Sequence, residues 1–162
     1  GTLPIMGYCL RSLSETGQRM REFDMSPFNG GYMTIEKLAR DPLRKSALGG
    51  HYVETISQIV LESINERPID ILLCMAQAPI SARALAELRK KGVITVLWFV
   101  EDYLRFTYWK EFAKHYDYIF TIQKGACIDA LKAAGCSEVH YLPTAADPGV
   151  HVPVSLTDEE RA

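Results

Sequence analysis

The chain has 162 residues, of which 48% are hydrophobic and 23% are charged, and its formal net charge is -2 at pH 7. This is the composition of a globular domain, which excludes a disordered tail, and the net charge gives no overall basic surface for nucleic acid or an anionic membrane. No apolar run approaches the roughly 20 residues of a transmembrane helix, and the N-terminus lacks the layout of a signal peptide. We therefore expect a cytoplasmic protein with no nucleic-acid partner and no transmembrane segment.

The first 68 residues predict mainly helices. An apolar stripe predicts a helix over residues 2–17, although residues 3–10 could instead form a short strand. Alternating residues over 18–25 predict a strand near a sheet edge. A short helix is expected over 34–40 and a longer one over 51–67, ended by Pro68. The glycine pairs at 30–31 and 49–50 lack the spacing of a nucleotide-binding loop and are interpreted as turns.

From residue 69 onward, short apolar runs alternate with helix-like segments. The apolar runs predict four strands, at residues 69–75, 93–100, 117–123 and 137–144. The segments between them predict three helices, at residues 79–92, 102–116 and 125–135. Such alternation implies a parallel sheet with right-handed crossovers. The expected fold class is α/β: a three-layer, Rossmann-like parallel sheet with helices on both faces.

A doubly wound domain normally opens with a strand, whereas this sequence opens on a predicted helix. We therefore expect one Rossmann-like domain over residues 1–153 whose first strand is absent. Residues 154–162 form a capped acidic segment, interpreted as the start of a linker to a missing C-terminal domain.

Ligands of open parallel sheets bind beyond the carboxyl ends of the strands. Four predicted loops lie there, reading AQAP, EDY, QKG and TAADP, and they gather polar side chains into a candidate cleft. These side chains belong to Gln77, Glu101, Asp102, Tyr103, Gln123, Lys124, Thr144 and Asp147.

The adjacent carboxylates after the second strand have two interpretations. Asp102 can simply cap a helix that begins at Tyr103, which aspartate does often. Glu101 is not needed for that cap, and carboxylates beside aromatic rings suit ligands rich in hydroxyl groups. Lys124 could meet an anion at the start of the following helix, or be a solvated loop lysine.

Cysteines and histidines show no spacing typical of a metal site, so we expect free thiols in a reducing compartment, no metal and no cofactor. The residues concerned are Cys9, Cys74, Cys127, Cys136, His51, His115, His140 and His151.

Three motifs together resemble the N-terminal half of the CgeB-like (spore maturation protein) glycosyltransferases, which are similar to GT-B enzymes. They are Trp98-Phe99 with Glu101-Asp102, the run YDYIFT at residues 116–121, and Leu142-Pro143 followed by ADP at 146–148. The match covers roughly residues 69–153, and the predicted first helix resembles the first Rossmann helix of these proteins. TAADP departs from the glycine-or-valine version common in GT-B chains.

The resemblance implies two Rossmann-like domains with the active site between them. This chain would be the acceptor-side N-terminal domain, inactive alone, of an enzyme that transfers a sugar from a nucleotide-sugar donor to a hydroxyl-bearing acceptor. Glu101 or Asp102 would act as the base, and Gln77, Tyr103, Gln123, Lys124, Thr144 and Asp147 would bind substrate. GT-B chemistry generally needs no tightly held metal.

Two other classes remain as alternatives. A non-catalytic sugar-nucleotide or phosphosugar-binding module would use the same cleft without transfer. A receiver domain fits less well, because its acidic pair follows the first strand and its acceptor aspartate follows a later one. A dinucleotide oxidoreductase would need the glycine fingerprint, which this sequence lacks.

Overall fold

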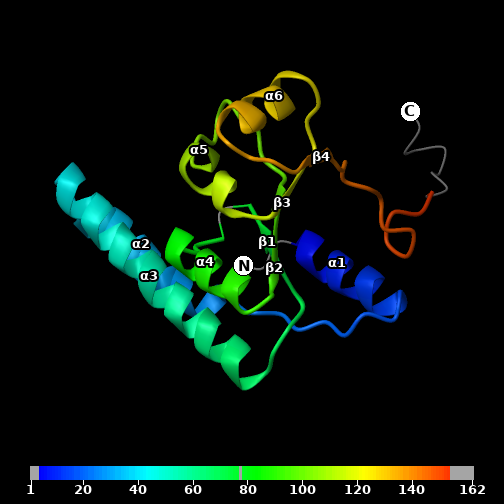
Figure 1. Ribbon diagram of the computed structural model, residues 1–162, viewed down its shortest axis with the longest axis horizontal. Helices are drawn as coiled ribbons and strands as arrows, with labels where there is room; N and C mark the ends of the chain where they lie inside the picture. The colour runs from blue at the N-terminus through cyan, green and yellow to red at the C-terminus, as the bar shows by residue number, and fades with distance from the viewer. Residues whose placement is uncertain (1–3, 77, 154–162) are drawn as a thin grey trace, which may run out of the picture. The chain divides into compact units, whose positions relative to one another are not determined.

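A computed structural model describes residues 4–76 and 78–153 of the chain (Figure 1). These residues form two compact units, one of residues 23–143 and one of residues 4–22 with 144–153. The predicted linker at 154–162 lies outside the described residues, so the single domain expected over 1–153 and its linker stay predictions. Within the described ranges, no helix is long and apolar enough to cross a membrane.

The first unit contains a parallel sheet of four strands in the order β1-β2-β3-β4, which confirms the four predicted strands and their direction. The strands are β1 (Ile71–Met75), β2 (Ile94–Phe99), β3 (Tyr118–Thr121) and β4 (Val139–Tyr141). Cys74, Leu97, Ile119 and Val139 are in register across the sheet. β1, β2 and β3 are short, largely apolar runs, as expected where at least one face is covered, whereas β4 reads Val-His-Tyr and buries only Val139.

The described part of this unit contains five α-helices, which agrees with the predictions in number but not in length, and two short 3₁₀ helices besides. They are the 3₁₀ helix η1 (Ser26–Phe28), α2 (Asn29–Leu38), α3 (Pro42–Glu66), α4 (Ala82–Lys90), α5 (Trp109–Phe112), the 3₁₀ helix η2 (Ala113–His115) and α6 (Ala126–Ala133). Gly92 and Gly135, with φ of +80° and +98°, follow α4 and α6 in the left-handed conformation that ends helices. Both glycine pairs interpreted as turns lie inside helices instead, in α2 and α3.

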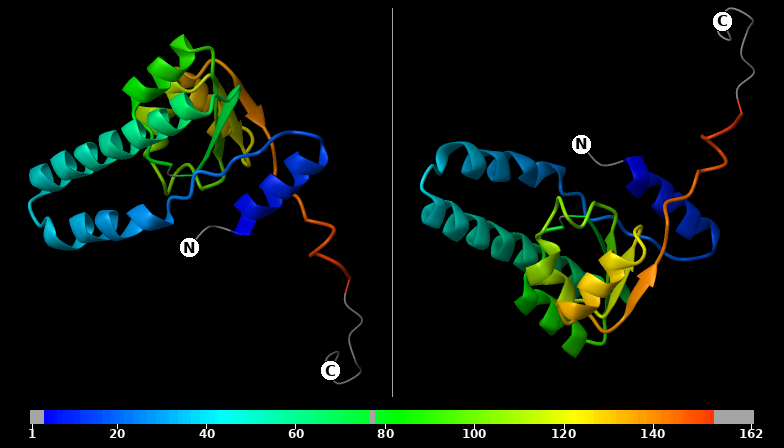
Figure 2. Two further views of the ribbon diagram at one scale, coloured as in Figure 1. Left: turned by 90° about the horizontal axis from the view of Figure 1, so that it is seen from below. Right: turned by 90° about the horizontal axis from the view of Figure 1, so that it is seen from above.

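The core lies on one face of the sheet. Leu97, Phe99 and Ile119 are fully buried, and they share one hydrophobic cluster with residues of α3, α4, α5 and α6. Trp98 and Phe120, which point to the opposite face, are only half-buried and lie outside that cluster. Strands added successively in one direction by right-handed crossovers place their helices on one side, which is the arrangement in Figure 2. The structure therefore shows a Rossmann-like α/β sheet with one helical layer from this unit.

The second unit contains α1 (Pro4–Glu15), the irregular residues that follow it to residue 22, and the irregular residues 144–153. Both ends of the described chain therefore belong to this unit. Arg11 pairs with Asp147, and the rings of Tyr8 and His151 meet edge-on with centroids 5.8 Å apart. The helix predicted over 2–17 is thus confirmed over Pro4–Glu15, and residues 16–17 form a turn.

The strand predicted over residues 18–25 is wrong, because this segment is irregular. Asp24 accepts hydrogen bonds from the backbone N–H of Ser26 at 2.8 Å and from its hydroxyl at 2.7 Å. These bonds turn the chain into η1 rather than leaving its backbone groups for a sheet, a competition typical of aspartate and serine.

Replacing Ser57 by alanine is expected to lower the free energy of unfolding by about 1–3 kcal/mol, measured by urea denaturation. The fully buried Ser57 hydroxyl accepts the backbone N–H of Ser81 at 2.8 Å and thereby joins α3 to the start of α4. Without it, that N–H loses its partner. Thr55→Ala is the control, because the exposed Thr55 hydroxyl bonds only to its own helix, at His51 O. Equal losses for both variants would contradict the interhelical role.

Candidate functional site

Glu101 lies two residues after the end of β2 and is oriented by a tyrosine from the same loop. The Tyr108 hydroxyl donates to Glu101 Oε2 at 2.7 Å, and the Tyr108 ring packs edge-on against Phe99 with centroids 5.8 Å apart. Burial and the neighbouring Glu101 carboxylate raise the pKa of Tyr108 far above its usual value of 10.0, so the phenol remains a donor. The half-buried Glu101 carboxylate is therefore positioned at the carboxyl end of an inner strand.

Asp102 has a structural role. Its Oδ1 accepts the backbone N–H groups of Leu104 and Arg105, both at 2.9 Å, while its carbonyl accepts Phe106 N at 2.9 Å. The bonds from Arg105 and Leu104 lower the pKa of the Asp102 carboxyl. The capping interpretation of Asp102 agrees with this geometry, although the capped element is a single turn rather than a helix.

The helix predicted over 102–116 is wrong over its first half, where only α5 and η2 form from Trp109 onward. Side chains bind the backbone that a helix would use: Gln123 Oε1 accepts Tyr103 N at 3.0 Å, and Trp109 Nε1 donates to Tyr103 O at 2.9 Å. The run of aromatic and β-branched residues from Phe106 to Trp109 also has low helix propensity.

Gln123 connects the loops after β2 and β3. Besides accepting from Tyr103, it donates its own backbone N–H to Thr121 Oγ1 at 3.2 Å. The next residue, Lys124, is exposed, with its Nζ 4.3 Å from the centre of the Tyr141 ring. The structure thus places Glu101, Asp102 and Tyr103 in one loop, which Gln123 from the next loop holds through Tyr103, while Glu101 is bonded to Tyr108 within its own loop.

The remaining predicted site residues are not placed in this group. Gln77 lies outside the described residues. Thr144 and Asp147 belong to the second unit, where Asp147 pairs with Arg11 and accepts Gly149 N at 2.8 Å. The Arg11 guanidinium is the main cause that lowers the pKa of the Asp147 carboxyl. Asp147 therefore organises its own turn.

Two features of the site were missed in the sequence. Tyr108 holds Glu101, and nothing in the spacing of seven residues predicts that bond. Ala76, directly after β1, has φ of +50°, a conformation that costs energy for a residue with a Cβ and tends to occur at functional loops. No sequence signal marks it, because alanine gives no preference for that region.

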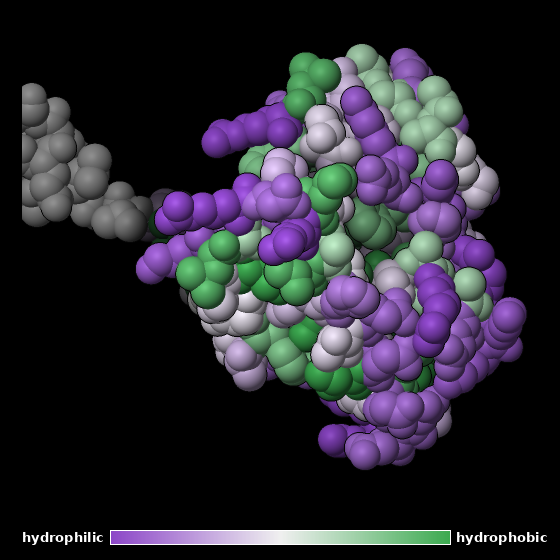
Figure 3. Space-filling model, turned by 90° about the vertical axis from the view of Figure 1, so that its left-hand side faces the viewer, coloured by the Kyte–Doolittle hydropathy of each residue, from purple (hydrophilic) through white to green (hydrophobic). Residues whose placement is uncertain are grey.

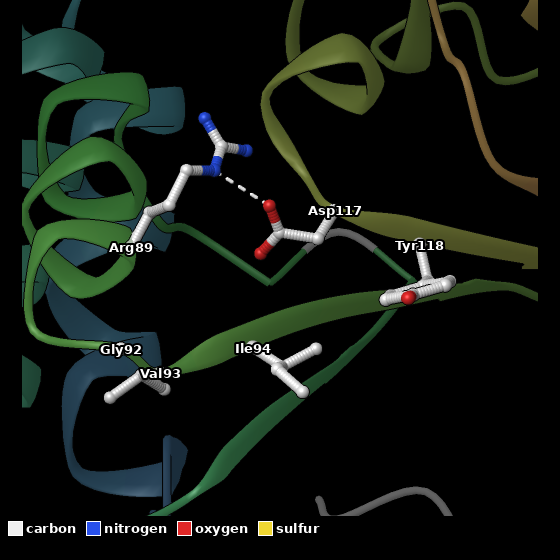
Figure 4. Close-up of a pocket in the computed structure, with 6 residues that line it drawn as sticks. All are labelled: Arg89, Gly92, Val93, Ile94, Asp117 and Tyr118. Atoms are coloured by element: carbon white, nitrogen blue, oxygen red, sulfur yellow. Dashed lines mark hydrogen bonds and ion pairs between the residues drawn. The ribbon is translucent and has the colours of Figure 1, made fainter.

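A hollow of about 280 Å³ lies at the opposite, amino ends of β2 and β3 (Figure 4). Arg89 Nε donates to Asp117 Oδ1 at 2.6 Å, and the other carboxylate oxygen accepts Thr95 N and Oγ1 at 2.8 and 2.7 Å. The Arg89 and Asp117 side chains are thus bonded to each other and, through Asp117, to Thr95 of β2. We therefore assign them a role in stabilising the fold. The candidate site remains at the carboxyl ends.

Replacing Asp117 by asparagine is expected to destabilise the protein by about 1–3 kcal/mol at neutral pH, and this loss should shrink in acid. Partial burial raises the pKa of the carboxyl, but bonds from Thr95 and Arg89 outweigh it, so the pKa lies below its usual 3.8. A carboxyl whose pKa is lower in the folded state stabilises the fold above pH 3.8, and this contribution is lost as pH falls through the folded-state pKa.

Urea unfolding of both proteins between pH 6 and strongly acidic pH measures this difference. Asp129→Asn is the matched control, because Asp129 is exposed on α6, away from Arg89 and Thr95, so that its replacement removes a carboxylate without removing these bonds. A constant gap between Asp117→Asn and the parent chain at every pH would show that the charge of Asp117 is irrelevant.

Among residues 4–76 and 78–153, no group of three or more histidine, cysteine, aspartate or glutamate side chains could hold a metal ion. By its fold, this part of the chain is a Rossmann-like α/β unit. The loops after β2 and β3 place polar residues at the carboxyl ends of its parallel strands. Comparison of the chain with protein-family models, with curated proteins and with solved structures gives no match in any of the three.

Proposed function

We propose that this chain is the acceptor-side N-terminal domain of a GT-B glycosyltransferase that transfers a sugar from a nucleotide-sugar donor. The observation that carries the proposal is the Glu101 carboxylate, held by Tyr108 at the carboxyl end of β2, where parallel sheets bind their ligands. The resemblance of the motifs around it to CgeB-like enzymes supports the same function.

In this proposal, Glu101 acts as a general base. It removes the proton of the acceptor hydroxyl while that oxygen attacks the anomeric carbon of the donor, and the nucleoside diphosphate leaves with the electron pair of the broken bond. Asp102 is assigned to the loop structure, since Leu104 and Arg105 already occupy its Oδ1. Gln123 keeps the base-bearing loop against β3 through Tyr103.

The proposal includes a three-layer sheet, a second Rossmann-like domain beyond this chain, and a cytoplasmic enzyme. The face of the sheet that carries Val96, Trp98 and Phe120 is apolar and only half-buried, which suits a further helical layer. Gln77, Tyr103, Gln123, Lys124, Thr144 and Asp147 are proposed to bind substrate, as the resemblance implies. The isolated chain is then expected to be inactive.

A non-catalytic sugar-nucleotide or phosphosugar-binding module is the second candidate. It is favoured by one observation: Lys124 is exposed two residues before the start of α6, where its ammonium group and free N–H groups of the helix could meet a phosphate. Such a module would bind through Lys124 without needing Glu101.

The test is a transfer screen of the full-length protein against a panel of nucleotide sugars, run beside the 162-residue chain. Nucleotide release by the full-length protein from one donor, with none by the chain alone, supports a site between two domains. Binding without release across the panel would favour the module. If the full-length protein shows no binding and no release with any donor, both functions are wrong. Transfer by the 162-residue chain alone would overturn the two-domain site.

A further inference from the structure

Helices α2 and α3 form a hairpin in which two leucines next to the connecting turn are strongly exposed. The helices lie side by side: Lys45 Nζ and Glu36 Oε2 are 2.6 Å apart, and the rings of Tyr32 and Tyr52 have centroids 5.8 Å apart. At the turn, Leu38 is 69% exposed and Leu43 is 82% exposed. Exposed neighbouring apolar side chains of this size mark interaction sites more often than isolated ones do.

Cations surround these leucines. We define the hairpin tip as Lys37, Leu38, Arg40, Leu43 and Arg44, all of which are exposed. Within the described chain, none of its three cations has an ion-pair or hydrogen-bond partner for its side chain, whereas the neighbouring Lys45 is paired with Glu36. Residues 37–44 carry these three cations and one carboxylate, that of Asp41, so the chain's net charge of -2 averages over a local net charge of +2.

The charge of Arg44 is not explained by the stability of its helix. Arg44 lies in the first turn of α3, which contains no acidic residue, and a cation at a helix N-terminus is unfavourable. Its backbone N–H is satisfied by the Asp41 cap at 2.9 Å, which leaves the side chain with no local role. A cation placed against the helix dipole, beside an exposed leucine, indicates an anionic partner.

We propose that the hairpin tip docks on an anionic lipid bilayer, with Leu38 and Leu43 inserted at the level of the headgroups. Two leucines at a projecting turn offer far less than the roughly 800 Å² that a stable protein interface takes from each partner. They do suit shallow insertion into a bilayer, where apolar groups enter the headgroup boundary and nearby lysine and arginine bind anionic lipid. Figure 3 views the molecule from the side toward which the hairpin points in Figure 1, and shows hydrophobic side chains bordered by hydrophilic ones.

The test is co-sedimentation of the 162-residue chain with vesicles of phosphatidylcholine alone and of phosphatidylcholine mixed with phosphatidylglycerol. Binding is expected only to the mixed vesicles and should weaken with salt. Leu38→Ser with Leu43→Ser is expected to lower the binding constant about tenfold or more. Lys37→Gln with Arg40→Gln and Arg44→Gln is expected to lower it about a hundredfold.

Matched controls come from the same unit. Leu104→Ser removes an equally exposed leucine, and Lys90→Gln with Lys110→Gln and Lys132→Gln removes three exposed cations away from the tip. Both controls should bind vesicles as the parent chain does, and circular dichroism checks that every variant is folded. No binding to mixed vesicles, or equal binding by tip and control variants, would overturn the proposal. Self-association in sedimentation velocity that only the tip variants abolish, without vesicle binding, would replace the bilayer with a second copy of the chain.

Discussion

Replacing Phe99 by alanine is expected to lower the free energy of unfolding by about 3–5 kcal/mol. Phe99 is fully buried at the end of β2, in the cluster that joins the sheet to its helices, and its ring meets Tyr108 edge-on. Truncation removes the apolar area of the ring and leaves a cavity that the sheet and helices cannot close. Urea denaturation followed by circular dichroism measures the loss.

Phe120→Ala is the matched control. Phe120 is on the adjacent strand and in register with Trp98, so its side chain points to the face opposite that of Phe99. It is half-buried and lies outside the core cluster, so its truncation should cost roughly 1.5 kcal/mol or less. If both variants lose the same free energy, the core does not lie on one face of the sheet.

The contrast between these two phenylalanines shows where sequence patterns stop being informative. Short apolar runs identified β1, β2 and β3, because burial of a parallel strand requires them, and the alternation of strands with helices placed β4, which buries only Val139. The order of the strands depends on the direction in which each crossover connection adds the next strand. No residue pattern in the sequence shows which face of β2 the helices cover. Phe99 and Trp98 are equally apolar in the sequence, yet only Phe99 belongs to the core.

Local hydrogen bonds explain the remaining differences. The helix α3 begins at Pro42 rather than near residue 51, and its start was detectable: Asp41 as cap before a proline is a common N-terminal signal. The loop after β2 was not predictable, because Gln123, 20 residues away, supplies the bond to Tyr103. Asp147 likewise depends on Arg11, 136 residues earlier in the chain. Hydrogen bonds between residues so far apart in the sequence produce no periodic pattern from which they could be predicted.

Replacing Glu101 by glutamine in the full-length protein is expected to lower the rate of sugar transfer by about 10²–10⁴-fold, as loss of a general base does. Glutamine keeps the size of the side chain and an oxygen that can accept from Tyr108, so the free energy of unfolding should change little. The substitution removes only the basicity of the carboxylate. Transfer rates with the donor found in the screen, measured against pH, give the effect.

Asp102→Asn separates catalysis from loop structure. The amide side chain keeps one oxygen for the N–H groups of Leu104 and Arg105, so transfer is expected to stay within about tenfold of the parent rate. Tyr108→Phe removes the hydroxyl that orients Glu101 and should produce an intermediate loss of transfer, because the base is then less well positioned. Unchanged transfer by Glu101→Gln, with Asp102→Asn inactive yet folded, would assign the base to Asp102. Unchanged transfer by both would place the catalytic base outside this loop, and the function of the loop would then be binding alone.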